Sequence, residues 1–183
     1  MRFYDLLEAW GRRLEALRPR ARSIAAGAYE PATPREALDA AEFARCHGAH
    51  AAAARYFAKG VDESLPEVGS PYIRVRFRAA RAAVLAAADD KLDAEQRKGL
   101  HERARTWLRQ ELVRWRKRLS TRKPLGKQKG VTFFEPQLWE WKFHLDFTSV
   151  KEARALERLP APERRAWTTL WKEVDEVLRL GPS

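Results

Sequence analysis

Apolar residues recur along most of the chain at intervals of three and four positions, which is the spacing of one face of an α-helix. No stretch alternates β-branched and polar residues with a period of two, so β-strands are not expected. The periodicity predicts about seven helices, over residues 3–17, 34–46, 50–62, 72–88, 94–119, 135–144 and 162–180. The predicted fold class is therefore all-α.

The helices at 34–46 and 50–62 are predicted to pack as an αα-hairpin. Thr33, Pro34 and Glu36 form the pattern of a helix start, in which the threonine caps the first turn and the glutamate follows three residues later. The faces expected to meet carry small residues, namely Ala37, Ala41, Ala44, Ala53 and Ala54. Small side chains allow two helix axes to approach closely.

The longest predicted helix has an apolar stripe suited to packing in a core. The stripe consists of Leu100, Ala104, Trp107, Leu108, Leu112, Trp115 and Leu119. Trp107 and Trp115 are flanked by arginine, as in sites that stack on bases. Their position on the stripe favours burial instead.

Positive charge is concentrated in one part of the chain. The sequence has 36 Lys and Arg against 25 Asp and Glu, for a net charge of +11. Residues 97–129 contain thirteen of these cations and two acids, Glu102 and Glu111, and so account for the whole excess. Charges that share a surface reinforce one another. This basic patch predicts an acidic protein segment as partner, with nucleic acid as the alternative.

The predicted partner-binding residues are cations of this patch. They are Arg105, Arg109, Arg116, Lys117, Arg122, Lys123, Lys127 and Lys129. Arg105, Arg109 and Arg116 align beside the apolar stripe and are expected to attract the acidic segment, while aromatic side chains supply buried area. The alternative is a solvated face, balanced by acids from the loop after helix 72–88 or from the last helix.

Trp139 and Trp141 are the aromatic contact candidates. They stand two positions apart, so on a helix they diverge by ~200° and cannot face the same way. One of the pair is therefore expected to be exposed to a partner.

Other patterns do not predict catalysis or a bound metal. Cys46, His47 and His50 offer three possible ligands at a helix end, but a fourth would have to come from His101, His144 or a distant carboxylate. The glycines and lysines at 126–130 lack the first glycine and the Ser or Thr of a phosphate-binding loop. We therefore expect no enzyme activity, no cofactor and no metal.

Cysteine content and hydropathy indicate the compartment. The single cysteine excludes a disulfide framework and fits a reducing environment. No apolar run approaches the ~18 residues of a membrane span, and the first residues lack an apolar export signal. The sequence thus predicts a cytoplasmic protein without a membrane span.

The hairpin resembles a tetratricopeptide repeat, a unit of about 34 residues made of two antiparallel helices. The residues that match its small, aromatic and terminal positions are Ala41, Gly48, Ala53, Phe57, Gly60 and Pro66. Helices 72–88 and 94–119 look like a second, degenerate repeat. The resemblance implies tetratricopeptide-like hairpins over residues 33–120, after an N-terminal helix and connector at 1–32.

Residues 121–183 comprise a basic loop and a segment that resembles the Trp-rich C-terminal helical cap of bacterial tetratricopeptide-repeat proteins. The matching residues, some of them in the preceding helix, are Trp107, Leu108, Leu112, Trp115, Leu119, Trp139, Trp141, Asp146, Val150, Leu156, Leu159, Pro160, Glu163, Trp167, Leu170, Trp171, Val174 and Asp175. Such caps often follow a serine/threonine protein kinase domain, so the resemblance implies an interaction scaffold or adaptor in signalling. The sequence itself has no Gly-rich loop, His-Arg-Asp or Asp-Phe-Gly motif of a kinase. A third interpretation is therefore a separated part of a kinase-linked protein.

Overall fold

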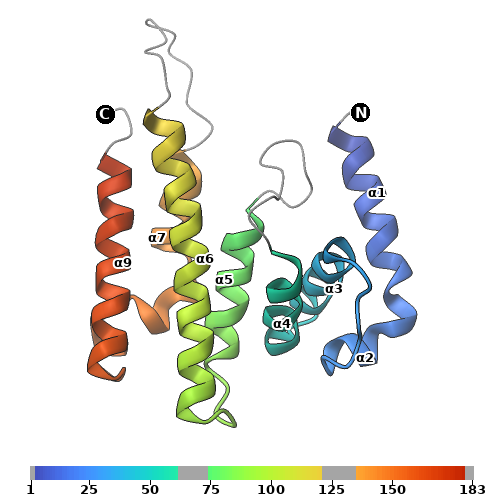
Figure 1. The fold of residues 1–183 in the computed structure, drawn as a ribbon, viewed down its shortest axis with the longest axis horizontal. Helices are drawn as coiled ribbons and strands as arrows, with labels where there is room; N and C mark the ends of the chain where they lie inside the picture. The colour runs from blue at the N-terminus through green and yellow to red at the C-terminus, as the bar shows by residue number, and fades with distance from the viewer. Residues whose placement is uncertain (1–2, 62–73, 121–134, 180–183) are drawn as a thin grey trace, which may run out of the picture.

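The computed structural model describes residues 3–61, 74–120 and 135–179, and the regular structure in these ranges is entirely helical (Figure 1). The longer helices are α1 (Phe3–Ala16), α3 (Pro34–Cys46), α4 (His50–Gly60), α5 (Val75–Ala86), α6 (Ala94–Ser120), α7 (Glu135–Phe143) and α9 (Ala161–Arg179). Short elements accompany them: the 3₁₀ helices η1 (Arg18–Arg20) and η2 (Leu145–Val150), and the helices α2 (Ala21–Ala25) and α8 (Ala153–Glu157). The all-α prediction is confirmed, and none of the described helices is both long and apolar enough to cross a membrane.

Each predicted helix corresponds to one of the longer helices. The segment after α1, predicted as a connector, contains η1 and α2, and the segment before α9 contains η2 and α8. These four elements have between 3 and 6 residues. An apolar pattern needs more turns than that to become visible, so periodicity does not predict them.

The long helices lie side by side in a row (Figure 1). α1 stands at one end, followed by α3, α4, α5, α6 and, at the other end, α9. α3 and α4 form one antiparallel hairpin, α5 and α6 form the next, and α4 packs against α5. α7 contacts α9, while η2 contacts α5 and α8. The segment between α6 and α9 therefore joins the last helix to the second hairpin.

The predicted start of α3 is confirmed. The Thr33 hydroxyl accepts a hydrogen bond from the backbone N–H of Glu36 at 3.1 Å. The Glu36 carboxylate accepts from the N–H of Ala32 at 2.8 Å, one residue before the cap, and from the hydroxyl of Tyr29. The hydrogen bonds from Tyr29 and Ala32 lower the pKa of Glu36. They also hold the connector against the first turn of α3.

Small side chains fill the contacts within and between the hairpins. The fully buried alanines of α3, α4 and α5 are Ala40, Ala41 and Ala44, then Ala53 and Ala54, and finally Ala79, Ala80, Ala82 and Ala83. They belong to one continuous core. Because their side chains are short, the helices approach closely, as the sequence predicts.

Tryptophans supply large side chains at the α6–α9 end of the row. Trp107, Trp115 and Trp167 are buried. Trp141 of α7 stacks on Phe77 of α5, with ring centres 5.5 Å apart and planes 8° from parallel. The burial of Trp107 and Trp115 confirms that they belong to the core, and it leaves neither ring available to stack on a base.

The end of α4 lies against the start of α3 with no room for a side chain. A Cβ at Gly60 would lie 2.7 Å from Cγ of Leu38 and 2.7 Å from the carbonyl oxygen of Pro34. We predict that Gly60→Ala lowers the free energy of unfolding by about 1–3 kcal/mol, because the backbone of α3 cannot move aside cheaply. Urea unfolding followed by circular dichroism measures the change.

The matched control is Gly99→Ala in α6, where a Cβ meets nothing within 4 Å. This variant is expected to stabilise the protein by as much as about 1 kcal/mol, because alanine favours the helix. Equal effects of the two substitutions would contradict the close approach of α3 and α4.

Candidate interaction surfaces

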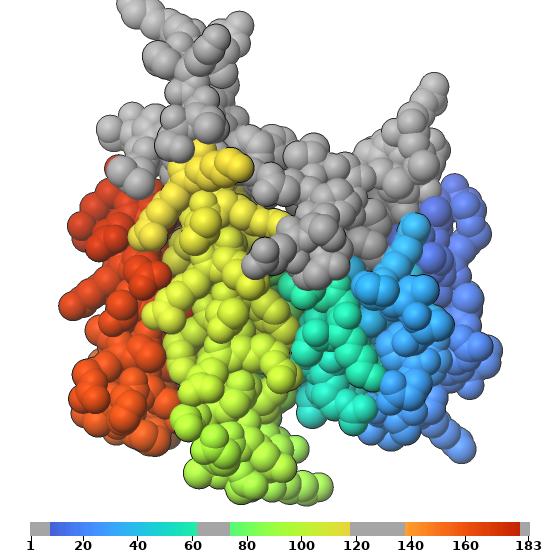
Figure 2. Space-filling model, in the orientation of Figure 1, coloured from blue at the N-terminus to red at the C-terminus, as the bar shows by residue number. Residues whose placement is uncertain are grey.

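The line of arginines on α6 faces α9. Arg109 lies 3.6 Å from Glu173, and Arg116 lies 3.5 Å from Glu176. Residue numbers rise together in these pairs, so α6 and α9 run in the same direction. Figure 2 shows the surfaces of the two helices directly beside each other.

The N-terminal half of the α6–α9 interface contains two buried polar side chains of α6, Arg105 and His101. Arg105 is buried, and its guanidinium carbon lies 5.3 Å from the centre of the Trp167 ring. Nδ1 of His101 lies 2.6 Å from Oε2 of Glu163. Burial lowers the pKa of Arg105, and burial also lowers the pKa of His101 although the hydrogen bond to Glu163 opposes it. These contacts join α6 to α9.

The prediction that Arg105, Arg109 and Arg116 attract an acidic partner is wrong for Arg105, which is buried. Arg109 and Arg116 are each paired with a carboxylate of α9, and their side chains are 44% and 43% exposed. Their pairing follows the alternative interpretation, in which acids of the last helix balance the cations, and their role as contacts for a partner stays a prediction. The pairing arises because arginines beside the apolar stripe of α6 lie at the edge of its contact with α9, within reach of acids at the edge of that helix.

The rest of the predicted basic patch is divided. Lys117 is exposed and takes part in an interaction within the chain. Arg97 donates hydrogen bonds to backbone carbonyl oxygens at the end of α5 and in the following loop, at 2.9 Å and 3.2 Å. The remaining four candidates lie outside the described residues; they are Arg122, Lys123, Lys127 and Lys129.

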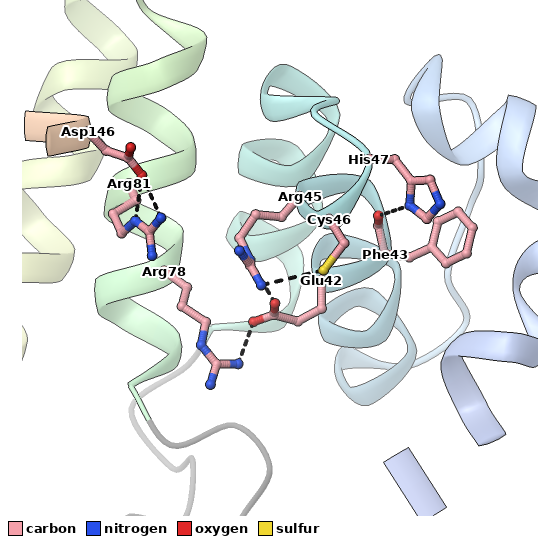
Figure 3. Close-up of polar contacts among 8 residues, drawn as sticks. All are labelled: Glu42, Phe43, Arg45, Cys46, His47, Arg78, Arg81 and Asp146. Carbon is pink, nitrogen blue, oxygen red and sulfur yellow. Dashed lines mark hydrogen bonds and ion pairs between the residues drawn. The ribbon is translucent and has the colours of Figure 1, made fainter. Parts of the chain in front are cut away.

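A second charged cluster joins α3 to α5 (Figure 3). The Glu42 carboxylate of α3 is fully buried and accepts from Arg45 of α3 and from Arg78 of α5, each at 2.8 Å. One turn further along α5, Arg81 donates to Asp146 of η2 at 2.6 Å. Helix periodicity does not predict this cluster. The one feature of the sequence that points to it is Glu42, a charged residue among the alanines of α3 that are expected to be buried.

Three arginines of this cluster, Arg45, Arg78 and Arg81, are called the arginine row below. Their side chains are 21–25% exposed, whereas the Glu42 side chain is 0% exposed. Solvent therefore meets guanidinium groups rather than the Glu42 carboxylate on this part of the surface. The row is electropositive at Arg45 and Arg78, whose shared carboxylate is buried, whereas Asp146, the partner of Arg81, is itself 21% exposed.

Cys46, His47 and His50 lie near the arginine row but do not form a common site. Nη2 of Arg45 is 3.5 Å from Sγ of Cys46, and the His47 ring stacks on Phe43. Burial lowers the pKa of His50, and nearby arginines act in the same direction. Among the described residues, no group of three or more His, Cys, Asp or Glu side chains is placed to hold a metal ion.

Large apolar side chains stand exposed where α7 meets η2. Trp139 is 46% exposed, Phe143 66% and Leu145 82%; these three residues are called the apolar patch below. The rings of Trp139 and Phe143 stack with centres 5.7 Å apart and planes 9° from parallel. Trp141, which points the other way, is 2% exposed. The prediction that one of the two tryptophans is exposed is confirmed for Trp139, and Trp141 is a core residue rather than a contact.

A shallow hollow of about 370 Å³ opens beside the apolar patch. It is lined by Glu140, Phe143, His144, Leu145 and Asp146. The Glu140 carboxylate is paired with Arg74, and Asp146 is the partner of Arg81. Burial lowers the pKa of His144. The hollow thus combines apolar walls with carboxylates that arginines already bind.

Comparisons with known proteins place no further constraint on these surfaces. No protein-family model, curated protein or solved structure matches the chain. What the chain does is therefore inferred from its own residues.

The ion pair that joins α3 to α5 depends on a buried carboxylate, that of Glu42. We predict that Glu42→Ala lowers the free energy of unfolding by about 3 kcal/mol, because it removes the partner of two partly buried arginines. Glu8→Ala is the control, since the Glu8–Arg12 pair is exposed, and it should change stability by less than about 0.5 kcal/mol. Urea unfolding of both variants tests this, and a Glu42→Ala effect as small as that of Glu8→Ala would contradict the structural role of the cluster.

Proposed function

We propose that this chain is a non-catalytic protein-interaction module, a tetratricopeptide-like scaffold that contacts its partner through the apolar patch. The observation that supports the proposal is the exposure of Trp139, Phe143 and Leu145 on two consecutive elements. Contiguous exposed apolar side chains mark interaction sites on many proteins. Aromatic residues in particular supply much of the binding energy at interfaces.

The apolar patch is held in place by the core beneath it. Trp141 and Phe147, which alternate with the exposed residues along the segment, are buried and pack on Phe77 of α5. The exposed rings of Trp139 and Phe143 are stacked on each other. A surface ordered before binding loses less conformational entropy when a partner docks.

Charged groups near the apolar patch support binding rather than catalysis. Glu42, Glu140 and Asp146 each have an arginine partner. A general base needs access to a substrate proton, and an arginine bonded to the carboxylate restricts that access. The polar groups of this region therefore suit recognition and structural support.

The resemblance to the tetratricopeptide caps that follow serine/threonine kinases supports a role in signalling. The row of antiparallel hairpins agrees with such a module. This chain has no kinase motif in its sequence. Kinase activity in such an assembly would belong to another domain, and this module would bind a protein segment.

A selection of ligands from a displayed library of random peptides tests the proposal. We predict that the chain enriches peptides with apolar anchors, and that the Trp139→Ala/Leu145→Ser variant binds them about tenfold or more weakly, because two exposed contacts are lost. Fluorescence anisotropy with the selected peptides measures the affinity. The control is Val113→Ser, which removes an exposed apolar side chain of α6 and should leave binding unchanged.

Circular dichroism confirms that each variant is folded. A selection that enriches no sequence, or ligands that bind the double variant as tightly as the original chain, would contradict a contact surface at the apolar patch.

Nucleic-acid binding is the second candidate, supported by the net charge of +11 and by exposed cations such as Arg103, Arg164 and Arg165. The pairing of the α6 arginines with α9 weakens this candidate. We predict no mobility shift of generic DNA or RNA at about 150 mM salt. A shift at that salt, with an affinity that falls steeply as salt rises, would favour nucleic acid over protein as the partner.

A further inference from the structure

We infer that the partner segment is acidic and carries an apolar anchor, with the anchor in the hollow beside the apolar patch and its carboxylates on the arginine row. This inference rests on the proposed function and specifies the chemistry of its ligand. The surface is composite: an apolar end on α7 and η2, and a guanidinium end on α5 and α3.

The two ends of this surface meet at one residue. Asp146 lines the hollow and also accepts from Arg81 at 2.6 Å. Arg78 lies one helical turn before Arg81 on α5, and it reaches Glu42 across the gap to α3 (Figure 3). A segment anchored in the hollow would therefore continue past Arg81 and Arg78 towards Arg45.

The arginine row retains donors for a partner. Within the described residues, these arginines use one or two guanidinium nitrogens each for their contacts, and every guanidinium carries further N–H groups. Because Glu42 is buried beneath Arg45 and Arg78 and these arginines are partly exposed, a carboxylate that approaches this part of the row meets N–H donors before it meets another acid. Arginine binds carboxylates in a two-point geometry that adds both strength and orientation.

Charge at the arginine row favours an acidic occupant over a basic segment. Arg45 and Arg78 share one buried carboxylate, that of Glu42, so positive charge is in excess there and repels a cationic partner. Opposite charge speeds the encounter and selects among partners, while the apolar contacts provide most of the affinity. The hollow supplies those contacts through Phe143 and Leu145, the two most exposed apolar side chains of the patch.

The test uses three labelled helical peptides of about 16 residues. All carry the same leucine and tryptophan anchors, and their polar positions hold glutamate, glutamine or lysine. Fluorescence anisotropy should show the glutamate peptide binding about tenfold more tightly than the glutamine peptide, and the lysine peptide binding most weakly. No binding of the glutamate peptide at about 1 mM overturns the inference, as does equal binding of the three peptides.

Variants locate the two ends of the surface. Arg81→Gln/Asp146→Asn removes the guanidinium without changing net charge, and it should weaken binding of the glutamate peptide about fivefold more than binding of the glutamine peptide. Phe143→Ser should weaken both peptides. Arg103→Gln, on exposed α6 surface, is the control and should change neither by more than a small, salt-sensitive amount.

Unchanged binding of the glutamate peptide to Arg81→Gln/Asp146→Asn would overturn the inference. Displacement of that peptide by a single-stranded oligonucleotide of equal length would also overturn it, because nucleic acid would then be the occupant.

Failure of the proposed function has a different signature. If the random library yields patch-dependent ligands that are neutral or basic, the interaction module stands and the acidic specificity falls. If the library yields no patch-dependent ligand, both fall.

Discussion

Arginine side chains that meet carboxylates across helix contacts are the interaction on which this fold depends. Arg13 of α1 bonds Asp39 of α3 at 2.8 Å, and Arg78 of α5 bonds the buried Glu42. The same arrangement joins α5 to η2 and α6 to α9. Such pairs add little stability compared with apolar residues of similar size, but loss of one partner leaves a costly charge behind. An acid opposite an arginine at a helix edge therefore prevents the cost of an unpaired, partly buried charge when the helices pack.

Alanine packing makes these ion pairs geometrically possible. Alanine and glycine at the contacts between α3, α4 and α5 bring the backbones close together. Long arginine side chains then span from one helix to the next along the edge of the contact, with their aliphatic portions on apolar surface and their charged ends at a carboxylate. The net charge of +11 is consequently a poor measure of the charge available to a partner. What matters for binding is whether the guanidinium or the carboxylate of each pair is the more exposed group, and at Glu42 it is the guanidinium.

The sequence predicted the parts of this structure that depend on local patterns. Helix periodicity, the Thr33 cap and the apolar stripe of α6 each involve residues close together in the chain, and all three are observed. The partners of the α6 arginines could not be predicted in the same way, because Arg109 and Glu173 are adjacent only after α6 and α9 pack. A sum of charges over a sequence window counts neighbours along the chain and misses such pairs. The spacing of Trp139 and Trp141 predicts that one of them is exposed, but which one depends on how α7 packs. The exposure of Leu145 depends on η2, an element too short to leave a periodic signal.

The short η2 element also explains how one segment can serve both the core and the surface. Over the run from Leu145 to Val150, Phe147 and Val150 are buried, Asp146 bonds Arg81, and Leu145 points to solvent. A 3₁₀ helix places residues three apart on the same side. The burial of Phe147 and Val150 therefore fixes the orientation of the other side chains of η2, including those of Leu145 and Asp146. The tight turn therefore allows an exposed apolar contact and a guanidinium-bound carboxylate to lie side by side, which is the combination that an acidic segment with an apolar anchor would recognise.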